Sequence, residues 1–171
     1  MKGYIQVYTG NGKGKTTAAL GLALRAAGAG LKVYFAQFIK GMRYSEHSSL
    51  EALADKITIR QYGRNCFIKG SPMEEDIRAA REGFLEIRGV ILSGKYHVVI
   101  LDEVNIATRY RLFSVQDLLD LILIKPDEVE IIITGRDADP RIIDAADLVT
   151  EMKEIKHYYK KGVSARDGIE K

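Results

Sequence analysis

The chain has 171 residues, 46% hydrophobic and 29% charged, and such a composition suits one globular domain with a sizeable core. Its net charge of +3 is too small, and its basic residues are too scattered, to indicate a nucleic-acid-binding surface. The single cysteine, Cys66, excludes an intrachain disulfide and favours a cytoplasmic setting. No apolar stretch approaches the roughly 20 residues of a membrane helix, and the first strand-like run starts too early for a signal peptide. We therefore expect one cytoplasmic domain over residues 1–171, without a membrane segment.

Strand-like apolar runs alternate with helical segments along the chain. In chain order we expect strand Tyr4–Tyr8, a helix from about Lys15 to Ala27, strand Val33–Phe38, a short helix near Ser48–Ala54, strand Ile57–Gln61, a helix that begins at Ser71–Glu74 and stops before Gly94, strand His97–Leu101, helix Ser114–Ile124, strand Val129–Thr134, a short helix from Asp139 to Ala146, and a last strand within Leu148–Ile155. In the long central helix, Ser71 is the expected cap, Pro72 lies in the first turn and Glu74 completes a capping box. The alternation predicts a three-layer α/β sandwich, with a mostly parallel sheet of about six strands and helices on both faces.

The first strand leads into a glycine-alternating loop, Thr9-Gly10-Asn11-Gly12-Lys13-Gly14-Lys15-Thr16-Thr17. Glycines permit positive φ and let backbone N–H groups turn inward around an anion, and the following helix adds partial positive charge at its N-terminus. Lys15 contributes a full charge, Lys13 is expected to touch phosphate as well, and the Thr16 hydroxyl stands where a magnesium ligand is expected. The standard phosphate loop has glycine five residues before Gly14, whereas this chain has Thr9. The loop therefore predicts a variant triphosphate site.

Two acidic residues, Asp102 and Glu103, follow the nearly all-apolar strand His97–Leu101. Alone they would be a solvated acidic turn, but beside a phosphate loop they indicate a magnesium site. Ligands of parallel α/β folds bind at the carboxyl ends of the strands. We therefore expect the phosphate loop, this acidic pair, Gly135-Arg136 and the Gly63–Gly70 loop at one edge of the sheet.

Several other residues allow two interpretations each. Arg25 is either a nucleotide contact or a solvent-facing helical cation, and Arg136 either projects into the site or forms a salt bridge with Asp137, Asp139 or Asp144. An aromatic residue of the Tyr62–Gly70 loop either covers a flat ligand or packs beneath the loop. The basic and aromatic stretch 156–161 is weak evidence for single-stranded nucleic-acid binding.

Taken in order, four motifs resemble the ATP:corrinoid adenosyltransferases of the phosphate-loop type, which have a P-loop NTPase-like fold. The motifs are residues 9–19, Gln37-Phe38-Ile39-Lys40-Gly41, Leu101-Asp102-Glu103 and Thr134-Gly135-Arg136, and the tail from Lys156 to Glu170 fits too. The resemblance covers almost the whole chain, and the family shares the form of loop that begins with threonine.

The resemblance implies transfer of the 5′-adenosyl group of ATP to the Co(I) of a corrinoid, cobalamin or cobyrinic acid a,c-diamide, with release of tripolyphosphate. It implies that no protein residue is the nucleophile, since Co(I) takes that role, and that ATP lies reversed relative to ordinary phosphate-loop enzymes. By position, Gly10–Thr17 and Arg25 would bind ATP, while Thr16 and Glu103, with Asp102 close by, would hold Mg²⁺, for which Mn²⁺ is a possible substitute. A reductase that supplies electrons and a homodimeric assembly are also implied, with no nucleic-acid or membrane partner.

Family members use aromatic residues after the third strand to displace the lower ligand of the corrinoid. This chain has no tryptophan, and Arg64 follows Gly63 where an aromatic is expected. Phe67, with Tyr62 in reserve, is therefore the expected corrinoid-facing aromatic, and Arg136 is expected to face the corrinoid as well. The alternatives are an ordinary ATPase or nucleotide kinase, and an ATP-dependent nucleic-acid-binding module.

Overall fold

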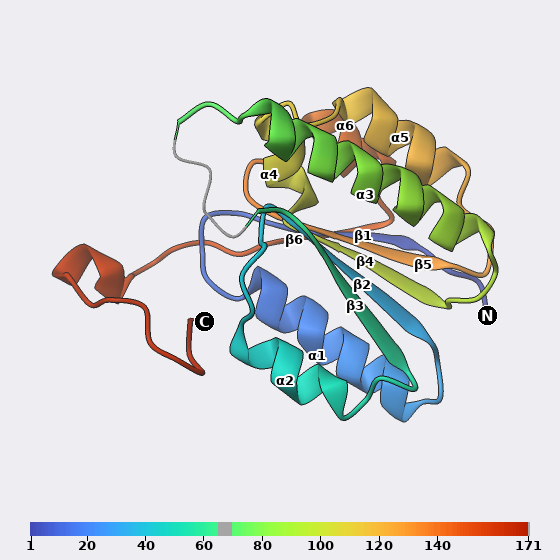
Figure 1. The fold of residues 1–171 in the computed structure, drawn as a ribbon, viewed down its shortest axis with the longest axis horizontal. Helices are drawn as coiled ribbons and strands as arrows, with labels where there is room; N and C mark the ends of the chain where they lie inside the picture. Colours follow the sequence, from blue (N-terminus) through green and yellow to red (C-terminus); the bar gives the residue numbers. More distant parts are fainter. Residues whose placement is uncertain (65–69, 171) are drawn as a thin grey trace.

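Six parallel strands form one sheet at the centre of the molecule, in the order β3-β2-β4-β5-β1-β6 (Figure 1). In the computed structural model, which describes residues 1–64 and 70–170, the strands are β1 (Ile5–Thr9), β2 (Val33–Phe38), β3 (Ile57–Tyr62), β4 (Val98–Asp102), β5 (Glu130–Thr134) and β6 (Leu148–Glu151). Every pairing between these strands is parallel. The prediction of a mostly parallel sheet of about six strands is confirmed.

Helices cover both faces of the sheet, as the alternating pattern predicts (Figure 1). α1 (Lys15–Gly28) and α2 (Ser45–Glu51) lie on one face. The other face carries α3 (Glu74–Leu92), α4 (Val104–Arg109), α5 (Val115–Leu123) and α6 (Pro140–Ala145). The α/β three-layer architecture of a P-loop NTPase-like fold is therefore confirmed.

The sheet separates two hydrophobic clusters. On the α1 side, Ala19 and Ala23 pack in one cluster with Phe35, Ile100 and Ile132 from the central strands. The larger cluster on the opposite side holds apolar side chains of β2, β4, β5, α3 and α5, among them Phe38, Leu101, Ile133, Ile87 and Leu118. Because both faces are covered, β2 and β4 are buried along their whole length, which explains why their sequences are apolar except for Gln37 and Asp102 near their carboxyl ends.

The start of α3 differs from the prediction. The helix begins at Glu74 with Met73 as its N-cap, so the capping box expected from Ser71 and Glu74 is wrong. The Asp76 carboxylate accepts a hydrogen bond from the Met73 backbone N–H at 2.9 Å, and Arg64 donates to the same carboxylate at 2.6 Å. Asp76 therefore caps this helix, held in place by an arginine of the preceding loop.

Three further elements differ from the sequence pattern. α4 follows β4 at once, through Glu103 in the left-handed region at φ 60°, and was not predicted. α2 begins at Ser45 rather than near Ser48, whereas the last strand, β6, lies within the expected range Leu148–Ile155. A 3-10 helix, η1 (Tyr158–Lys161), lies in the C-terminal stretch.

The carboxyl ends of the strands gather the segments that the motifs singled out. The loop after β1, the end of β4 and the C-terminal stretch with η1 lie toward this edge (Figure 1). Strand β5 lies between β4 and β1, so the acidic pair and the phosphate loop do not follow neighbouring strands. Among the described residues, no helix is long and apolar enough to cross a membrane.

Candidate functional site: a phosphate loop beside a buried carboxylate

The loop after β1 has the backbone geometry that its glycines predict. Gly10 has φ +94° and Gly14 has φ +120°, and a Cβ at Gly10 would lie 2.4 Å from the carbonyl oxygen of Met152. The Gly12 N–H donates to that same carbonyl at 2.7 Å. Glycine is therefore required at residue 10 both by its φ and by the close approach of the segment after β6.

Thr9, the departure from the standard loop, has a structural role. It is the last residue of β1 and is buried, and its hydroxyl accepts a hydrogen bond from the Ala138 backbone N–H at 3.3 Å. A glycine at this position would lose that contact. Thr9 thus connects the phosphate loop to the segment between β5 and α6.

The Lys15 side chain is held by hydrogen bonds to the backbone of the phosphate loop. It is the first residue of α1 and is buried, and its ammonium donates to the carbonyl oxygens of Gly10 at 2.6 Å and Gly12 at 2.8 Å. Burial lowers the pKa of this ammonium, while the nearby Glu103 carboxylate opposes the shift. An ammonium has three N–H donors, so two of them position Lys15 and the third is left for an anion in the loop.

The Asp102 carboxylate is the centre of a buried polar cluster at the end of β4. Its side chain has no exposed surface. One oxygen, Oδ1, accepts hydrogen bonds from the hydroxyls of Thr16 at 2.9 Å and Thr134 at 2.7 Å. The other oxygen, Oδ2, accepts from the Lys40 ammonium at 2.9 Å, and Lys40 also lies 3.3 Å from the Thr16 hydroxyl. The cluster joins the phosphate loop to β4 across the intervening strand β5.

Lys40 and Thr134 were not assigned roles from the sequence. Both belong to quoted motifs, but neither pattern indicates a contact with Asp102. Lys40 reaches it because β2 pairs with β4, in a register that sets Gln37 opposite Asp102. Burial, the largest single influence, lowers the pKa of Lys40, but the charge and hydrogen bond of Asp102 together with the charges of Glu103 and Glu46 raise it, and the net shift is upward.

Glu103 lies beside this cluster. Its backbone N–H donates to the Thr134 hydroxyl at 3.0 Å, and its side chain is partly buried. Burial raises the pKa of the Glu103 carboxyl and the Asp102 charge raises it further, while Lys40 and Lys15 act in the opposite direction. The two acids predicted to serve a metal are therefore neighbours, but only Asp102 bonds to Thr16.

The donor set of this cluster fits a hard divalent cation. Among residues 1–64 and 70–170, no group of three or more His, Cys, Asp or Glu side chains could hold a metal ion by itself. Magnesium is commonly held by one or two carboxylates together with substrate phosphates, and it prefers oxygen ligands. Thr16 and Asp102 supply hydroxyl and carboxylate oxygens, and the Lys40 ammonium between them shows that the position accepts positive charge.

Lys13 is bound by the C-terminal segment. Its ammonium donates to the Glu170 carboxylate at 2.8 Å, the Ile169 carbonyl at 2.9 Å and the Tyr158 hydroxyl at 3.1 Å. Glu170 also accepts hydrogen bonds from Tyr158 and Arg166. We call these residues, Lys13, Tyr158, Arg166, Ile169 and Glu170, the C-terminal clasp. It connects the phosphate loop to a segment that the sequence pattern left without a structural assignment.

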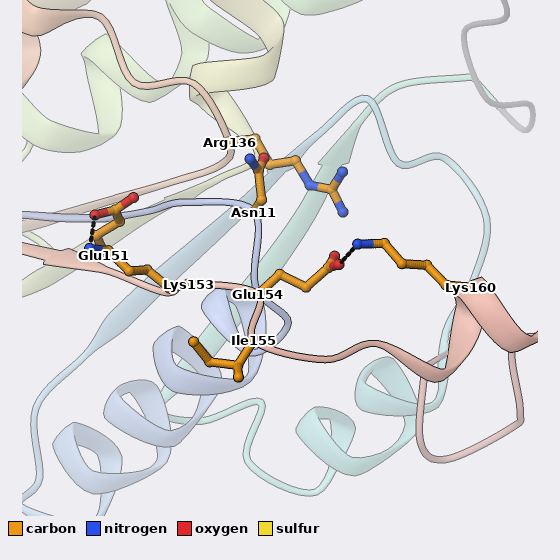
Figure 2. A pocket seen from close by; sticks show the side chains of 7 residues that line it. All are labelled: Asn11, Arg136, Glu151, Lys153, Glu154, Ile155 and Lys160. Atoms are coloured by element: carbon orange, nitrogen blue, oxygen red, sulfur yellow. Dashed lines mark ion pairs between the residues drawn. The ribbon is translucent and has the colours of Figure 1, made fainter.

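A cleft of about 540 Å³ opens beside the phosphate loop. Figure 2 shows the side chains around it, which are Asn11, Arg136, Glu151, Lys153, Glu154, Ile155 and Lys160. Glu154 and Lys160 form an ion pair at its side. Among the described residues Arg136 makes no ion pair: Asp137 pairs with Arg109, Asp139 pairs with Arg141, and Asp144 forms none. The interpretation of Arg136 as a cleft residue is therefore favoured over a salt bridge with these aspartates.

Comparison with known proteins identifies the family. The model of the family described as ATP:corrinoid adenosyltransferase BtuR/CobO/CobP matches residues 1–170. The corrinoid adenosyltransferase of Pseudomonas aeruginosa is 33% identical over 170 residues, which cover 99% of this chain and 84% of that protein. The chain belongs to the ATP:corrinoid adenosyltransferase family. The resemblance predicted from the ordered motifs is confirmed.

Two further adenosyltransferases match over a similar span. The corrinoid adenosyltransferase of Escherichia coli K12 is 35% identical over 170 residues, covering 99% of this chain and 86% of that protein. Corrinoid adenosyltransferase CobA of Salmonella typhimurium is 34% identical over 170 residues, with the same coverage. The family model, which matches residues 1–170, spans the phosphate loop, the acidic pair and the C-terminal clasp.

Not every residue predicted for an adenosyltransferase site lies at the phosphate loop. Arg25 is exposed in the last turn of α1, about 15 Å along the helix from Lys15 at the usual rise per residue. Tyr62 is packed at the end of β3. Its hydroxyl lies 2.5 Å from that of Tyr34, and a Cβ at Gly83 would come within 2.3 Å of its ring. Both assignments, a nucleotide contact for Arg25 and a corrinoid contact for Tyr62, stay predictions.

The aromatic residue preferred for the corrinoid falls outside the described part of the chain. Phe67 and Cys66 both belong to residues 65–69, which the structure does not describe. Arg64, which stands where the family pattern has an aromatic, donates to Asp76 at 2.6 Å and to Glu75 at 2.8 Å. The assignment of Phe67 to the corrinoid also stays a prediction.

Proposed function

We propose that the chain transfers the 5′-adenosyl group of ATP to the Co(I) of a corrinoid and releases tripolyphosphate. In this reaction Co(I) attacks C5′, the bond between C5′ and its phosphate oxygen breaks, and the triphosphate leaves with the bonding electron pair. The corrinoid thereby supplies the nucleophile, and the protein has to align the reactants and neutralise charge. The expected corrinoids are cobalamin and cobyrinic acid a,c-diamide.

The observation that carries the proposal is the concentration of cations at the phosphate loop of an adenosyltransferase family member. Lys15 lies directly after the loop, Lys40 contacts Thr16, and Lys13 lies in the loop with its ammonium bound by the C-terminal clasp. A departing triphosphate gains negative charge as its bond to C5′ breaks, so positive groups at its oxygens stabilise the transition state. Such a site suits a triphosphate that leaves as one intact group, as adenosyl transfer requires.

A divalent cation has a place in this proposal. Thr16 and Asp102, with Glu103 beside them, would hold Mg²⁺, and Mn²⁺ is the expected substitute. The ion would neutralise part of the triphosphate charge. The loop Gly10–Thr17 would bind the triphosphate itself through backbone N–H groups and Lys15.

We propose further that the cleft beside the phosphate loop binds the corrinoid. Arg136 and Asn11 line the cleft directly beside the loop, so a corrinoid bound there would lie within reach of the adenosyl end of ATP. Homodimeric assembly and a reductase that delivers the electron for Co(I) are further expectations. Sedimentation of the purified chain tests the first, and dependence of the rate from Co(II) on an added reductase tests the second.

Product analysis separates adenosyl transfer from its alternatives. Phosphorus NMR of an anaerobic reaction with ATP, Mg²⁺ and chemically reduced cobalamin should show tripolyphosphate that forms only when the corrinoid is present. An ordinary ATPase or kinase would give ADP or phosphate without corrinoid, and that result would refute the proposal. A nucleic-acid-binding module would bind single strands in a salt-sensitive way without any response to corrinoid.

A further inference from the structure

Lys40 occupies the position between the oxygens that are expected to bind the metal. Its ammonium lies 2.9 Å from Asp102 Oδ2 and 3.3 Å from Thr16 Oγ1. The Lys40 side chain is 18% exposed and that of Asp102 is 0% exposed. We propose that Lys40 is a built-in substitute cation, which neutralises Asp102 until Mg²⁺ arrives with ATP and which the metal then displaces.

The charge of the cluster explains why a substitute is needed. A buried carboxylate without an opposite charge is strongly destabilising, even when hydroxyl groups donate to it. Thr16 and Thr134 donate to Asp102 but carry no charge. Of the ion pairs within the described residues, only the one with Lys40 involves Asp102. Lys40 is therefore the group that makes a buried Asp102 tolerable.

The same geometry makes metal binding depend on the movement of Lys40. A divalent ion bonded to Thr16 and Asp102 would lie at the present position of the ammonium, and two cations this close repel each other. The side chain of Lys40 is long, and part of it is exposed, so it can leave without a change in the strand. A triphosphate offers the displaced ammonium new anionic oxygens. Metal alone should therefore bind weakly, and metal with nucleotide should bind well.

Lys40 acts here as a positioning residue. It holds the Thr16 hydroxyl and the Asp102 carboxylate in the arrangement that the metal later uses, because it contacts both. This inference rests on the proposed function for the identity of the incoming ligand, Mg²⁺ with ATP. The contact itself does not depend on which group ATP transfers.

The test measures binding of Mn²⁺ alone to the full chain, without nucleotide, by the electron paramagnetic resonance signal of the unbound ion. Lys40→Met removes the competing charge, and we expect it to bind Mn²⁺ at least tenfold more tightly than the wild type. Lys40→Arg keeps the charge and should bind as weakly as the wild type. Lys95→Met is the matched control, because it removes a lysine charge from an exposed position before β4 and should change nothing.

Two further variants show whether the additional Mn²⁺ affinity depends on Asp102 and whether the result could come from misfolding. The double variant Lys40→Met/Asp102→Asn should not show the higher Mn²⁺ affinity of Lys40→Met, since the carboxylate that attracts the ion is absent. Lys40→Gln also removes the charge but keeps a polar side chain beside Asp102, and its Mn²⁺ affinity is measured in the same way. Circular dichroism checks that each variant is folded. Folded Lys40→Met and Lys40→Gln proteins that bind Mn²⁺ no more tightly than the wild type would overturn the inference.

The outcome is separable from that of the transferase assay. If the wild type transfers adenosyl groups but neither Lys40 variant gains affinity for Mn²⁺, the inference fails and the proposed function stands. If the variants gain affinity but no adenosyl transfer is found, the substitute cation stands and the proposed function fails.

Discussion

The strongest prediction concerns the buried charge of Asp102. Asp102→Asn keeps the shape of the side chain but removes the charge that pairs with Lys40 at 2.9 Å. Removal of one partner from a buried ion pair costs about 3–5 kcal/mol. Because the Lys40 side chain is 18% exposed and can reach water, we expect the lower end of this range, about 3 kcal/mol. For a protein of this size that corresponds to a melting temperature lower by roughly 6–12 °C.

Urea unfolding followed by circular dichroism measures this change in the free energy of unfolding. Asp55→Asn is the matched control, because it removes the same charge from an exposed residue and should shift stability by less than about 0.5 kcal/mol. The double variant Lys40→Met/Asp102→Asn should be destabilised by less than the sum of the single variants, since neither charge is left alone. A loss below about 1 kcal/mol for Asp102→Asn, or strict additivity in the double variant, would refute the buried-pair reasoning.

Four further predictions address the loop, the metal, the helix cap and the clasp. Lys15→Ala should weaken ATP binding roughly 100-fold in isothermal titration calorimetry. If the variant binds ATP as tightly as the wild type, Lys15 does not contact the triphosphate. Glu103→Gln should change the Mg²⁺ dependence of the rate more than the KM for corrinoid, and the reverse result would reassign that residue. Hydrogen bonds from Arg64 hold the pKa of Asp76 below its usual range, so the stability they provide is present above about pH 4 and is lost as the pH falls through the lowered pKa. Arg64→Gln should therefore be about 1–2 kcal/mol less stable than the wild type at pH 7, with the gap closing below about pH 4 in urea titrations, and a gap independent of pH would contradict this. Glu170→Gln should speed tryptic cleavage of the C-terminal stretch severalfold, and an unchanged cleavage rate would show that the clasp does not hold that stretch.

Local patterns predicted the parts of the fold that depend on neighbouring residues. Strand β2 was predicted with the bounds it has, because burial on both faces leaves a sequence that is apolar at every position except Gln37. The start of α1 at Lys15 followed from the glycine loop before it. The position of Asp102 followed from the apolar run of β4.

Contacts between distant segments were not predictable in the same way. Lys40 meets Asp102 only because β2 and β4 pair, and Lys13 meets Glu170 across a separation of 157 residues. The cap of α3 was wrong because Ser71, Pro72 and Glu74 fit a local cap pattern, whereas Arg64 holds Asp76 at the helix start. α4 was missed because its six residues are too few to show a helical period.

The most direct test of the proposed function is formation of the cobalt–carbon bond. The chain is incubated without oxygen with ATP, Mg²⁺ and chemically reduced cobalamin, and the absorption spectrum is followed in the dark and then under light. We predict a spectrum of alkylated cobalamin that forms only with the active chain, disappears on illumination and is absent with Lys15→Ala. If cobalamin stays unalkylated while ATP is hydrolysed at the same rate with and without the corrinoid, the account of this chain as an adenosyltransferase is contradicted.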